Sequence, residues 1–394
     1  MLAVMLCVYT YSQSQEISDT SFGKGLINFT AKDSSFSVKF APRFQVRSIS
    51  SWDHDGDQYG SPDHTFIVRR ARLKFDGFAY SPKLKYKFEL GLSNRDIAGA
   101  NQFNRNTPRF ILDAVVMWNF ANNWELWAGQ TKLPGNVERV VSSGNLQLIN
   151  RSLLNSRFNI DRDLGVQLRH KSDLGGGFLM REKLSISQGE GRNVTSGNEG
   201  GFQYTARLEF LPFGNFKSKG DYSESDLKRE PKPKLMVGFT CNLNQDAVRE
   251  RGFAGDYMFR SDGSLYETDQ TTLFADAMFK YNGFSFMGEY AKRTAKDPLA
   301  TDIDGSLTGD VVLTGDALNL QAGYLFKNNY EVVGRFTTLD YEAVTDALPT
   351  SQYTLGVSKY IVGHKLKVQS DLSYTSVDGN DDNIMFRIGF DIHF

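Results

Sequence analysis

A strict two-residue alternation of apolar and polar side chains limits how this chain can fold more than any other feature. It is clearest at the end, residues 384–394, where every second residue is apolar and the residues between include Arg387, Gly389, Asp391 and His393. In an extended strand this order gives one apolar and one polar face, whereas a helix would scatter the apolar residues around its circumference. A terminal strand with a free edge invites aggregation. We therefore expect this strand to pair with the first one and close a barrel.

The same alternation recurs along the whole chain. An even number of strands is expected when a closed antiparallel barrel has both termini on one side, and the pattern gives about sixteen. The predicted fold is therefore all-β, a transmembrane antiparallel β-barrel. We predict strands at residues 36–50, 65–80, 83–93, 110–120, 124–131, 163–171, 178–188, 202–211, 234–242, 271–281, 284–293, 317–326, 330–339, 352–361, 364–376 and 384–394.

The connections between these strands alternate in length. Every second one is short, at residues 81–82, 121–123, 172–177, 282–283, 327–329 and 362–363. Those between them are longer and rich in Asp, Gly, Ser and Thr, at residues 51–64, 94–109, 132–162, 189–201, 243–270, 294–316, 340–351 and 377–383. Short periplasmic turns and long external loops produce this order in outer-membrane barrels, and a soluble sandwich has no reason to keep it. Residues 212–233 break the rule, and we expect a periplasmic excursion or a disordered turn there.

Hydropathy and aromatic residues agree with strands that cross a membrane. Mean hydropathy is -0.39, and after the first few residues no apolar run is long enough to cross a bilayer as a helix. Alternation hides the hydrophobicity of membrane strands from such an average. Aromatic residues also gather beside the short turns, as at a membrane interface, although hairpin ends of a soluble β-protein can carry them too. They are Tyr80, Trp118, Phe120, Trp124, Phe210, Phe213, Tyr281, Phe284, Tyr324, Phe326, Tyr330, Tyr360 and Phe394.

The first residues have the character of an export signal. Residues 1–15 are short and apolar and end in a polar stretch, although the usual positive start is missing. We predict a signal peptide at 1–15, a periplasmic segment at 16–34 and one barrel domain at 35–394. Cys7 would leave with the signal, so Cys241 would remain without a disulfide partner, as an outward-facing apolar filler.

Basic residues dominate the polar face of the first three predicted strands. They are Lys39, Arg43, Arg47, Arg70, Arg72, Lys74, Lys83, Lys85 and Lys87, and the acids on that face are Asp76 and Glu89. Because neighbouring strands lie about 4.8 Å apart, these side chains would form a basic stripe down one wall of the lumen. A narrow passage focuses such a field and concentrates anions. Alternatively, the charges only solvate a polar interior and pair across strands, since a net charge of -1 means that acids elsewhere balance the stripe.

Other chemistry finds little support in the sequence. The five histidines are scattered without metal-ligand spacing, and no nucleophile elbow or paired catalytic constellation is present. The Gly189-Glu190-Gly191 stretch is followed by no helix pattern that would make it a phosphate cradle. Asp53, Asp55 and Asp57 resemble a calcium loop but have the wrong glycine spacing, and an ion or lipopolysaccharide bridge is the alternative to a plain loop there. We therefore predict no enzyme, no cofactor, no metal site and no nucleic-acid partner.

Six stretches of the chain resemble the phosphate-selective porin O and P family, in its Bacteroidota form. They are FGKGLINFTAKDSSFSVKF near the start, GQTKLP at 129–134, RSLLNSRFNIDRDLGVQL at 151–168, SQGEGRN at 187–193, ARLEFLPFGNF at 206–216 and DAMFKYNGFSFMGEYAKR at 276–293. Together they span most of the chain after the signal. The sequence departs from the family at Ala41-Pro42-Arg43-Phe44, where a glycine-rich end is usual, and at Thr131, where an aromatic residue is common.

The resemblance implies a sixteen-stranded outer-membrane channel, commonly a trimer, whose third external loop folds inward to narrow the pore. Here that loop is residues 132–162. It carries Glu138 and Asp161 against the cations Lys132, Arg139, Arg151, Arg157 and Arg162, so the constriction would be cationic.

Two functions remain compatible with the sequence. The first is a passive channel that draws small anionic solutes along the basic stripe, in contact with outer-membrane lipid and lipopolysaccharide. The second is a non-conducting barrel that serves as a structural or loop-display subunit of a larger assembly, supported by the long loops 243–270 and 294–316. Stepwise conductance in a planar bilayer, with anion selectivity that weakens when Arg72, Lys85 and Lys87 become glutamate, distinguishes the first from the second.

Overall fold

The computed structural model describes residues 21–54, 56, 58–97, 99–195, 197–378 and 382–394. The predicted signal peptide with Cys7 lies outside these residues, as do Asp55 and Asp57 of the acidic triplet. None of the helices in the described ranges is both long enough and apolar enough to cross a bilayer.

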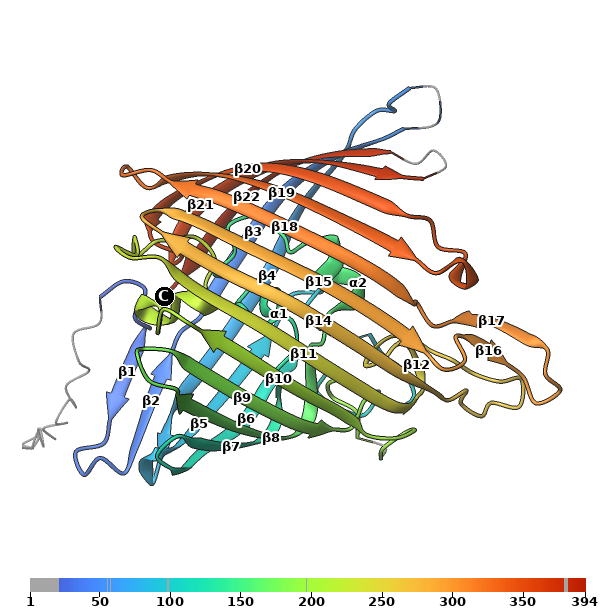
Figure 1. Cartoon of the computed structure of the whole chain (residues 1–394), viewed down its shortest axis with the longest axis horizontal. Coiled ribbons are helices and arrows are strands. Elements are labelled where there is room, and N and C mark those ends of the chain that lie inside the picture. Colours follow the sequence, from blue (N-terminus) through green and yellow to red (C-terminus); the bar gives the residue numbers. More distant parts are fainter. Residues whose placement is uncertain (1–20, 55, 57, 98, 196, 379–381) are drawn as a thin grey trace, which may run out of the picture.

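Sixteen antiparallel strands form one closed barrel (Figure 1), which confirms the predicted fold class. They are β3 (Arg43–Asp53), β4 (Asp63–Ala79), β5 (Ser81–Gly91), β6 (Ile111–Ala121), β7 (Trp124–Lys132), β8 (Arg162–Asp173), β9 (Leu179–Ser187), β10 (Gln203–Leu211), β11 (Lys234–Ala247), β14 (Thr268–Tyr281), β15 (Phe284–Ala295), β18 (Gly315–Leu325), β19 (Tyr330–Tyr341), β20 (Thr350–Val362), β21 (Leu366–Val377) and β22 (Asn383–His393). The short turns and the C-terminus lie at one end of the barrel, and the long loops at the other.

The last strand closes the barrel against the first. β22 pairs antiparallel with β3 over eleven residue pairs, from Asn383 opposite Asp53 to His393 opposite Arg43. Every backbone edge of the cylinder is therefore paired, as a bilayer requires, because the hydrocarbon offers no hydrogen-bond partners. The pairing of the terminal strand that its alternation predicts is confirmed.

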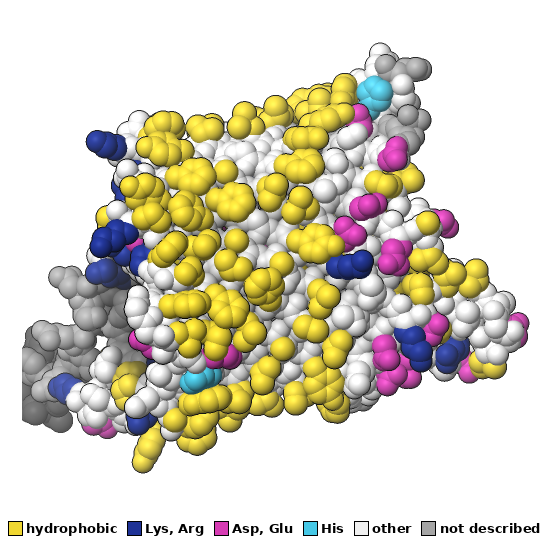
Figure 2. All heavy atoms as spheres, in the orientation of Figure 1, with side chains coloured by type: hydrophobic (Ala, Val, Ile, Leu, Met, Phe, Trp, Pro, Cys, Tyr) yellow, Lys and Arg dark blue, Asp and Glu magenta, His cyan; other side chains and the backbone are white. Residues whose placement is uncertain are grey.

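The barrel wall is apolar outside and polar inside. Phe66 is 80% and Leu355 61% exposed on the outer face, while Asp113 and Glu209 have no exposed surface inside. Cys241 is likewise exposed, as its parity predicts. Figure 2 shows hydrophobic side chains over the middle of one face, with charged groups toward the two ends. Apolar side chains outside and polar side chains inside are the reverse of the arrangement in a soluble protein, and they fit a wall between lipid and water.

Several smaller elements extend from the barrel. They are β1 (Ile27–Thr30), β2 (Phe36–Phe40), β12 (Arg249–Arg251), β13 (Ala254–Tyr257), β16 (Leu299–Thr301), β17 (Leu307–Val311) and the 3-10 turn η2 (Ala343–Thr345). The predicted strand 36–50 is divided at Ala41-Pro42, because proline has no N–H to give to the ladder. Beyond this break β2 pairs with the end of β4, and β1 adds to β2.

One residue of the predicted aromatic belt is placed differently. Tyr80, Trp118 and Tyr324 are exposed at the short-turn end, as expected, but Tyr360 is 1% exposed. Its hydroxyl donates a hydrogen bond to Glu331 at 2.5 Å inside the barrel. The expectation was wrong for Tyr360 because this residue has the inward parity of β20, with Thr354 and Ser358.

Candidate functional site

The loop 132–162 lies inside the barrel and contains two short helices, α1 (Val137–Val140) and α2 (Leu153–Phe158). Its apolar residues Leu133, Leu154 and Phe158 are buried against wall residues of β14, β15, β18 and β19. Ser152 caps α2 by accepting a hydrogen bond from the Asn155 backbone N–H at 3.1 Å. Apolar packing therefore fastens the loop to one side of the lumen.

Two wall glycines make room for the tip of this loop. A Cβ atom at Gly323 would lie 2.6 Å from the Gln147 amide nitrogen, and one at Gly356 would lie 2.4 Å from the Leu148 Cδ2. Both separations are far below van der Waals contact. The wall is thus shaped to receive the loop at a defined depth.

The segment 212–233 also folds into the lumen, from the end of the short turns. This corrects the expectation of a periplasmic excursion or disordered turn: Phe216 is 4% and Glu224 2% exposed. It contains the 3-10 turn η1 (Lys217–Tyr222), and Phe216 joins a buried cluster with Val137 and Val141 of the loop. Apolar contact with the loop and the inner wall offsets the cost of enclosing a polar segment.

Glu224 ties this segment to the loop. Its backbone N–H donates to the Asn145 carbonyl at 3.0 Å, and its carboxylate accepts the Gln147 N–H at 2.7 Å. The same carboxylate accepts the Gln321 side-chain amide of β18 at 3.0 Å. One residue therefore joins segment 212–233, the loop and the wall.

Glu224 should make the stability of the barrel depend on pH. Burial, and then the charge of Glu138, raise the pKa of Glu224 from its ordinary value of 4.5 to about 7. A raised folded-state pKa contributes stability that is complete below pH 4.5 and lost as the pH rises through 7. For Glu224→Gln we expect about 1–3 kcal/mol less loss of stability between pH 4.5 and 8 than in the parent. Thermal unfolding at both pH values measures this, and parallel losses in the two proteins would contradict it.

The space between the loop and the β3–β8 wall is a cavity of about 330 Å³, named here the constriction cavity. Its acidic lining residues are Glu89, Asp96 and Asp161. Its basic lining residues are Arg43, Arg69, Arg70, Arg72, Lys87, Arg95, Lys132, Arg139, Arg151, Arg162 and Arg192. The excess of cations gives the cavity a positive field, which the surrounding low-dielectric wall strengthens.

Part of this positive charge is offset by ion pairs. Arg72 bonds Asp96 at 2.5 Å and Glu89 at 3.2 Å, and Arg162 bonds Asp113 at 3.0 Å. Cross-strand pairing, the alternative weighed for the basic stripe, therefore does occur. It accounts for only some of the cations.

Other cations in the cavity bind neutral groups. Arg70 donates to the Gln45 side-chain carbonyl at 2.7 Å, and Arg151 to the Glu138 and Val141 carbonyls at 2.8 and 2.6 Å. Lys132 donates to three carbonyls at the end of α1, the shortest contact being 2.6 Å. Burial, and then the charge of Arg139, lower the pKa of Arg151 to about 9, so it stays charged at neutral pH. In the part of the chain that the structure describes, no carboxylate within ion-pair distance offsets the charges of Arg70 and Arg151, whereas the three N–H groups of Lys132 are all used by the loop carbonyls.

A β-bulge adds one more cation. Gln45 pairs with Arg70 and Val46 with Val68, so Arg69 is an extra residue between them. A bulge re-aims side chains locally, and Arg69 and Arg70 both line the constriction cavity although they are consecutive. Strict alternation would have placed Arg69 on the outer face.

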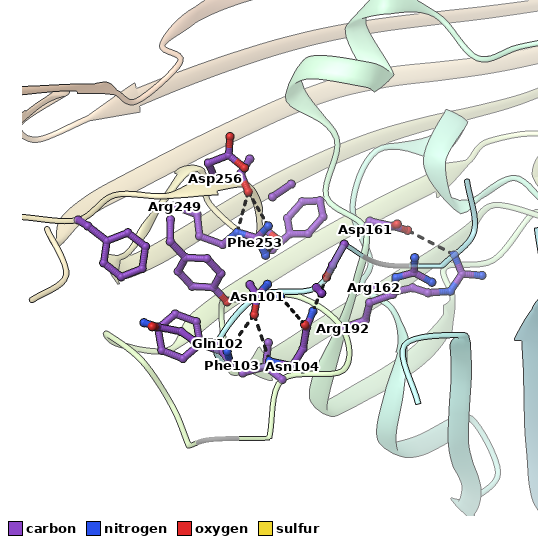
Figure 3. A pocket seen from close by; sticks show the side chains of 17 residues that line it. Asn101, Gln102, Phe103, Asn104, Asp161, Arg162, Arg192, Arg249, Phe253 and Asp256 are labelled. Atoms are coloured by element: carbon purple, nitrogen blue, oxygen red, sulfur yellow. Dashed lines mark hydrogen bonds and ion pairs between the residues drawn. The ribbon is translucent and has the colours of Figure 1, made fainter. Parts of the chain in front are cut away.

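Two further cavities share lining residues with the constriction cavity. On the loop side, a space of about 620 Å³, named here the outer vestibule, shares Asp161, Arg162 and Arg192 with it (Figure 3). On the turn side, a space of about 830 Å³ next to Trp127 and Arg169 shares Val140 with it. The three cavities therefore adjoin one another between the loop end and the turn end of the barrel.

The family can be assigned from the sequence match to a family model. The model of phosphate-selective porin O and P matches residues 44–384. The chain belongs to this family. It is an integral outer-membrane porin, a channel for passive diffusion.

Solved structures share the fold of this porin at low sequence identity. The anion-selective porin from Comamonas acidovorans has a TM-score of 0.56 and 12% identity, with 91% of this chain and 100% of that one covered. The outer-membrane channel DcaP of Acinetobacter baumannii has a TM-score of 0.56 and 12% identity, with 93% and 100% covered. OmpF of Salmonella typhi, in complex with daunomycin, has a TM-score of 0.56 and 11% identity, with 93% of this chain and 100% of that one covered. A comparison with curated protein sequences finds no match.

The porin fold brings some of the predicted site residues together and separates others. Arg43, Arg70, Arg72 and Lys87 of the basic stripe line the constriction cavity, as do Lys132, Arg139, Arg151 and Arg162 of the loop. Arg47 is buried in an ion pair with Asp391 at 2.7 Å. The predicted residues that do not line the cavity are Lys39, Arg47, Lys74, Lys83, Lys85 and Arg157.

Sequence reasoning missed Arg69, Arg95 and Arg192. Arg69 depends on the bulge, and Arg95 lies in an external loop without periodicity. Arg192 belongs to the SQGEGRN stretch of the family resemblance, which was the available signal for it. Among the described residues, no three His, Cys, Asp or Glu side chains are placed to hold a metal ion.

Proposed function

We propose that this porin prefers anions and passes small phosphate-like anions through the constriction cavity. The observation that carries the proposal is the lining of that cavity, with eleven basic side chains and three carboxylates. An anion entering it gains charge interactions and hydrogen bonds with arginine forks suited to phosphate geometry. The loop and the basic wall then act together, and no covalent step is involved.

Two results from the comparisons support the same preference. The family is described as phosphate-selective, and the porin from Comamonas acidovorans is described as anion-selective. In this proposal outer-membrane lipid and lipopolysaccharide surround the barrel, and small anionic solutes pass through it. The homotrimer, the signal peptide at 1–15 and the periplasmic segment at 16–34 stay predictions.

The second candidate, a non-conducting structural barrel, has one observation in its favour. Both the loop 132–162 and segment 212–233 occupy the lumen and bury much of their surface there. Three adjoining cavities between the loop end and the turn end favour the channel instead.

Planar-bilayer recording tests the proposal. We expect stepwise conductance. In a salt gradient, we expect a reversal potential whose sign shows that anions permeate more readily than cations. Inorganic phosphate should reduce the chloride current, because it competes for the same arginines. A folded barrel without conductance would instead support the structural role, and a cation-sign reversal potential would overturn the anion preference.

A further inference from the structure

The outer vestibule differs from the constriction cavity in being partly aromatic. Its lining includes the rings of Phe103, Phe253, Tyr257 and Phe259, contributed by two external loops. The rings of Phe103 and Tyr257 have centroids 4.5 Å apart, and those of Tyr257 and Phe259 are 6.3 Å apart. Phe103 and Tyr257 are each 8% exposed, whereas Phe259 is 37% exposed. Phe103 and Tyr257 therefore pack within the loops, whereas Phe253 and Phe259 keep exposed ring surface that a ligand can contact.

Polar contacts hold the vestibule open. The Arg249 guanidinium donates to the carbonyls of Glu190, Phe253 and Gly255, at 2.6, 3.1 and 2.5 Å. It also lies 4.7 Å from the centroid of the Tyr257 ring. On the facing loop, the Asn104 side chain donates to the Gly99 carbonyl at 2.9 Å (Figure 3). Because these contacts are made within and between the external loops, the walls are pre-organised for a ligand.

Arg192 lies where the vestibule meets the constriction cavity. One of its terminal nitrogens donates to the Asp96 carbonyl at 2.5 Å. The other, Nη1, is buried and has no partner among the described residues. A buried donor without a partner is costly, and an anion at this junction would satisfy it. Arg162 and Asp161 also line both cavities and are ion-paired at 3.6 Å, which leaves Arg192 as the charge offered to an anion there.

We propose that the outer vestibule binds organic anions that carry a flat aromatic group, and that it presents their charged end to Arg192. The aromatic body would pack on Phe253 and Phe259, and the phosphate or carboxylate would lie at the junction. A space of about 620 Å³ holds more than an inorganic anion. This inference rests on the proposed anion preference and adds a class of solute to it.

Two phosphate esters with the same charged group test the inference. Phenyl phosphate and methyl phosphate are titrated against the chloride current of the whole porin in a planar bilayer, first from one side and then from the other. We expect phenyl phosphate to halve the current at about a tenfold lower concentration than methyl phosphate, from one side only, because ring packing adds to the charge interaction. Equal blocking concentrations would overturn the inference.

Variants separate the contribution of the vestibule's aromatic rings from that of its charged residue Arg192. Phe253→Leu and Phe259→Leu keep an apolar side chain, and each should reduce the preference for phenyl phosphate by about two- to fivefold. Arg192→Gln should weaken both esters alike. Phe120→Leu, at an exposed aromatic residue at the short-turn end of β6, is the matched control and should leave the preference unchanged.

The outcomes distinguish this inference from the proposed function. A preference that is unchanged in both leucine variants, including the case in which both esters weaken by the same factor, would overturn the vestibule as the aromatic site. If the parent keeps an anion-sign reversal potential throughout, the anion preference stands without the vestibule. A cation-sign potential in the parent would overturn the anion preference itself.

Discussion

Replacing Arg69 and Arg70 together with glutamate is expected to remove the anion preference and move the reversal potential toward the cation side. Both residues line the constriction cavity, and the Arg70 side chain donates a hydrogen bond to the neutral amide of Gln45. The change is four charge units. At about 6 Å in water each unit is worth about 0.7 kcal/mol to a monovalent ion. After screening by salt, we expect a 10- to 100-fold change in the anion-to-cation permeability ratio.

The matched control makes the same charge change at the periplasmic end. Lys83 and Lys85 lie in β5 at the short-turn end, are exposed and do not line the constriction cavity. Their double replacement by glutamate should change the ratio less than threefold, because water and salt screen exposed charges. Equal shifts in the two double variants would mean that overall charge, and not the constriction cavity, governs selectivity.

This choice of residues revises the one that the sequence favoured. Arg72 and Lys87 do line the cavity, but both are in ion pairs with buried carboxylates. Reversing the charge of Arg72 or Lys87 would leave those carboxylates without partners and destabilise the wall. A change in selectivity could then not be told apart from a change in folding. Arg69 and Arg70 offer the cleaner test.

Replacing residues 212–233 with a short turn should widen the channel. The segment supplies Phe216 to the buried cluster that includes Val137 and Val141, and Glu224 to the hydrogen bonds with Asn145 and Gln147. Without them the loop tip loses its support on the turn side. We expect single-channel conductance to rise at least twofold, with noisier current and a lower thermal unfolding temperature. Bilayer recording and a heat-modifiability gel measure both effects.

The control for this deletion shortens an external hairpin. Shortening β16–β17, which projects from the loop end (Figure 1), removes chain without touching the loop 132–162. Its conductance should match that of the parent. If the two deletions change conductance equally, segment 212–233 does not support the constriction.

The barrel itself was largely predictable from the sequence. Alternation with period two identifies each membrane strand, because lipid on one side and water on the other select opposite side chains at successive positions. The alternating lengths of the connections indicate which end carries the loops. Tyr360 and Arg69 are where this reasoning failed. The parity of Tyr360 is inward in spite of its place beside a short turn, and a local bulge breaks the alternation at Arg69.

Sequence alone determined the all-β barrel, its closure by residues 384–394 and the basic character of its first wall, since each follows from spacing along one strand. Tertiary structure decided which cations face the passage, because only the placed loop shows that Arg70 and Arg151 meet across a cavity while Lys83, Lys85 and Arg157 lie away from it. It also decided that segment 212–233 enters the lumen, through contacts with residues distant in sequence such as Gln147 and Gln321. Periodicity reports which face of its own strand a side chain occupies, and it carries no information on what comes to lie opposite that face.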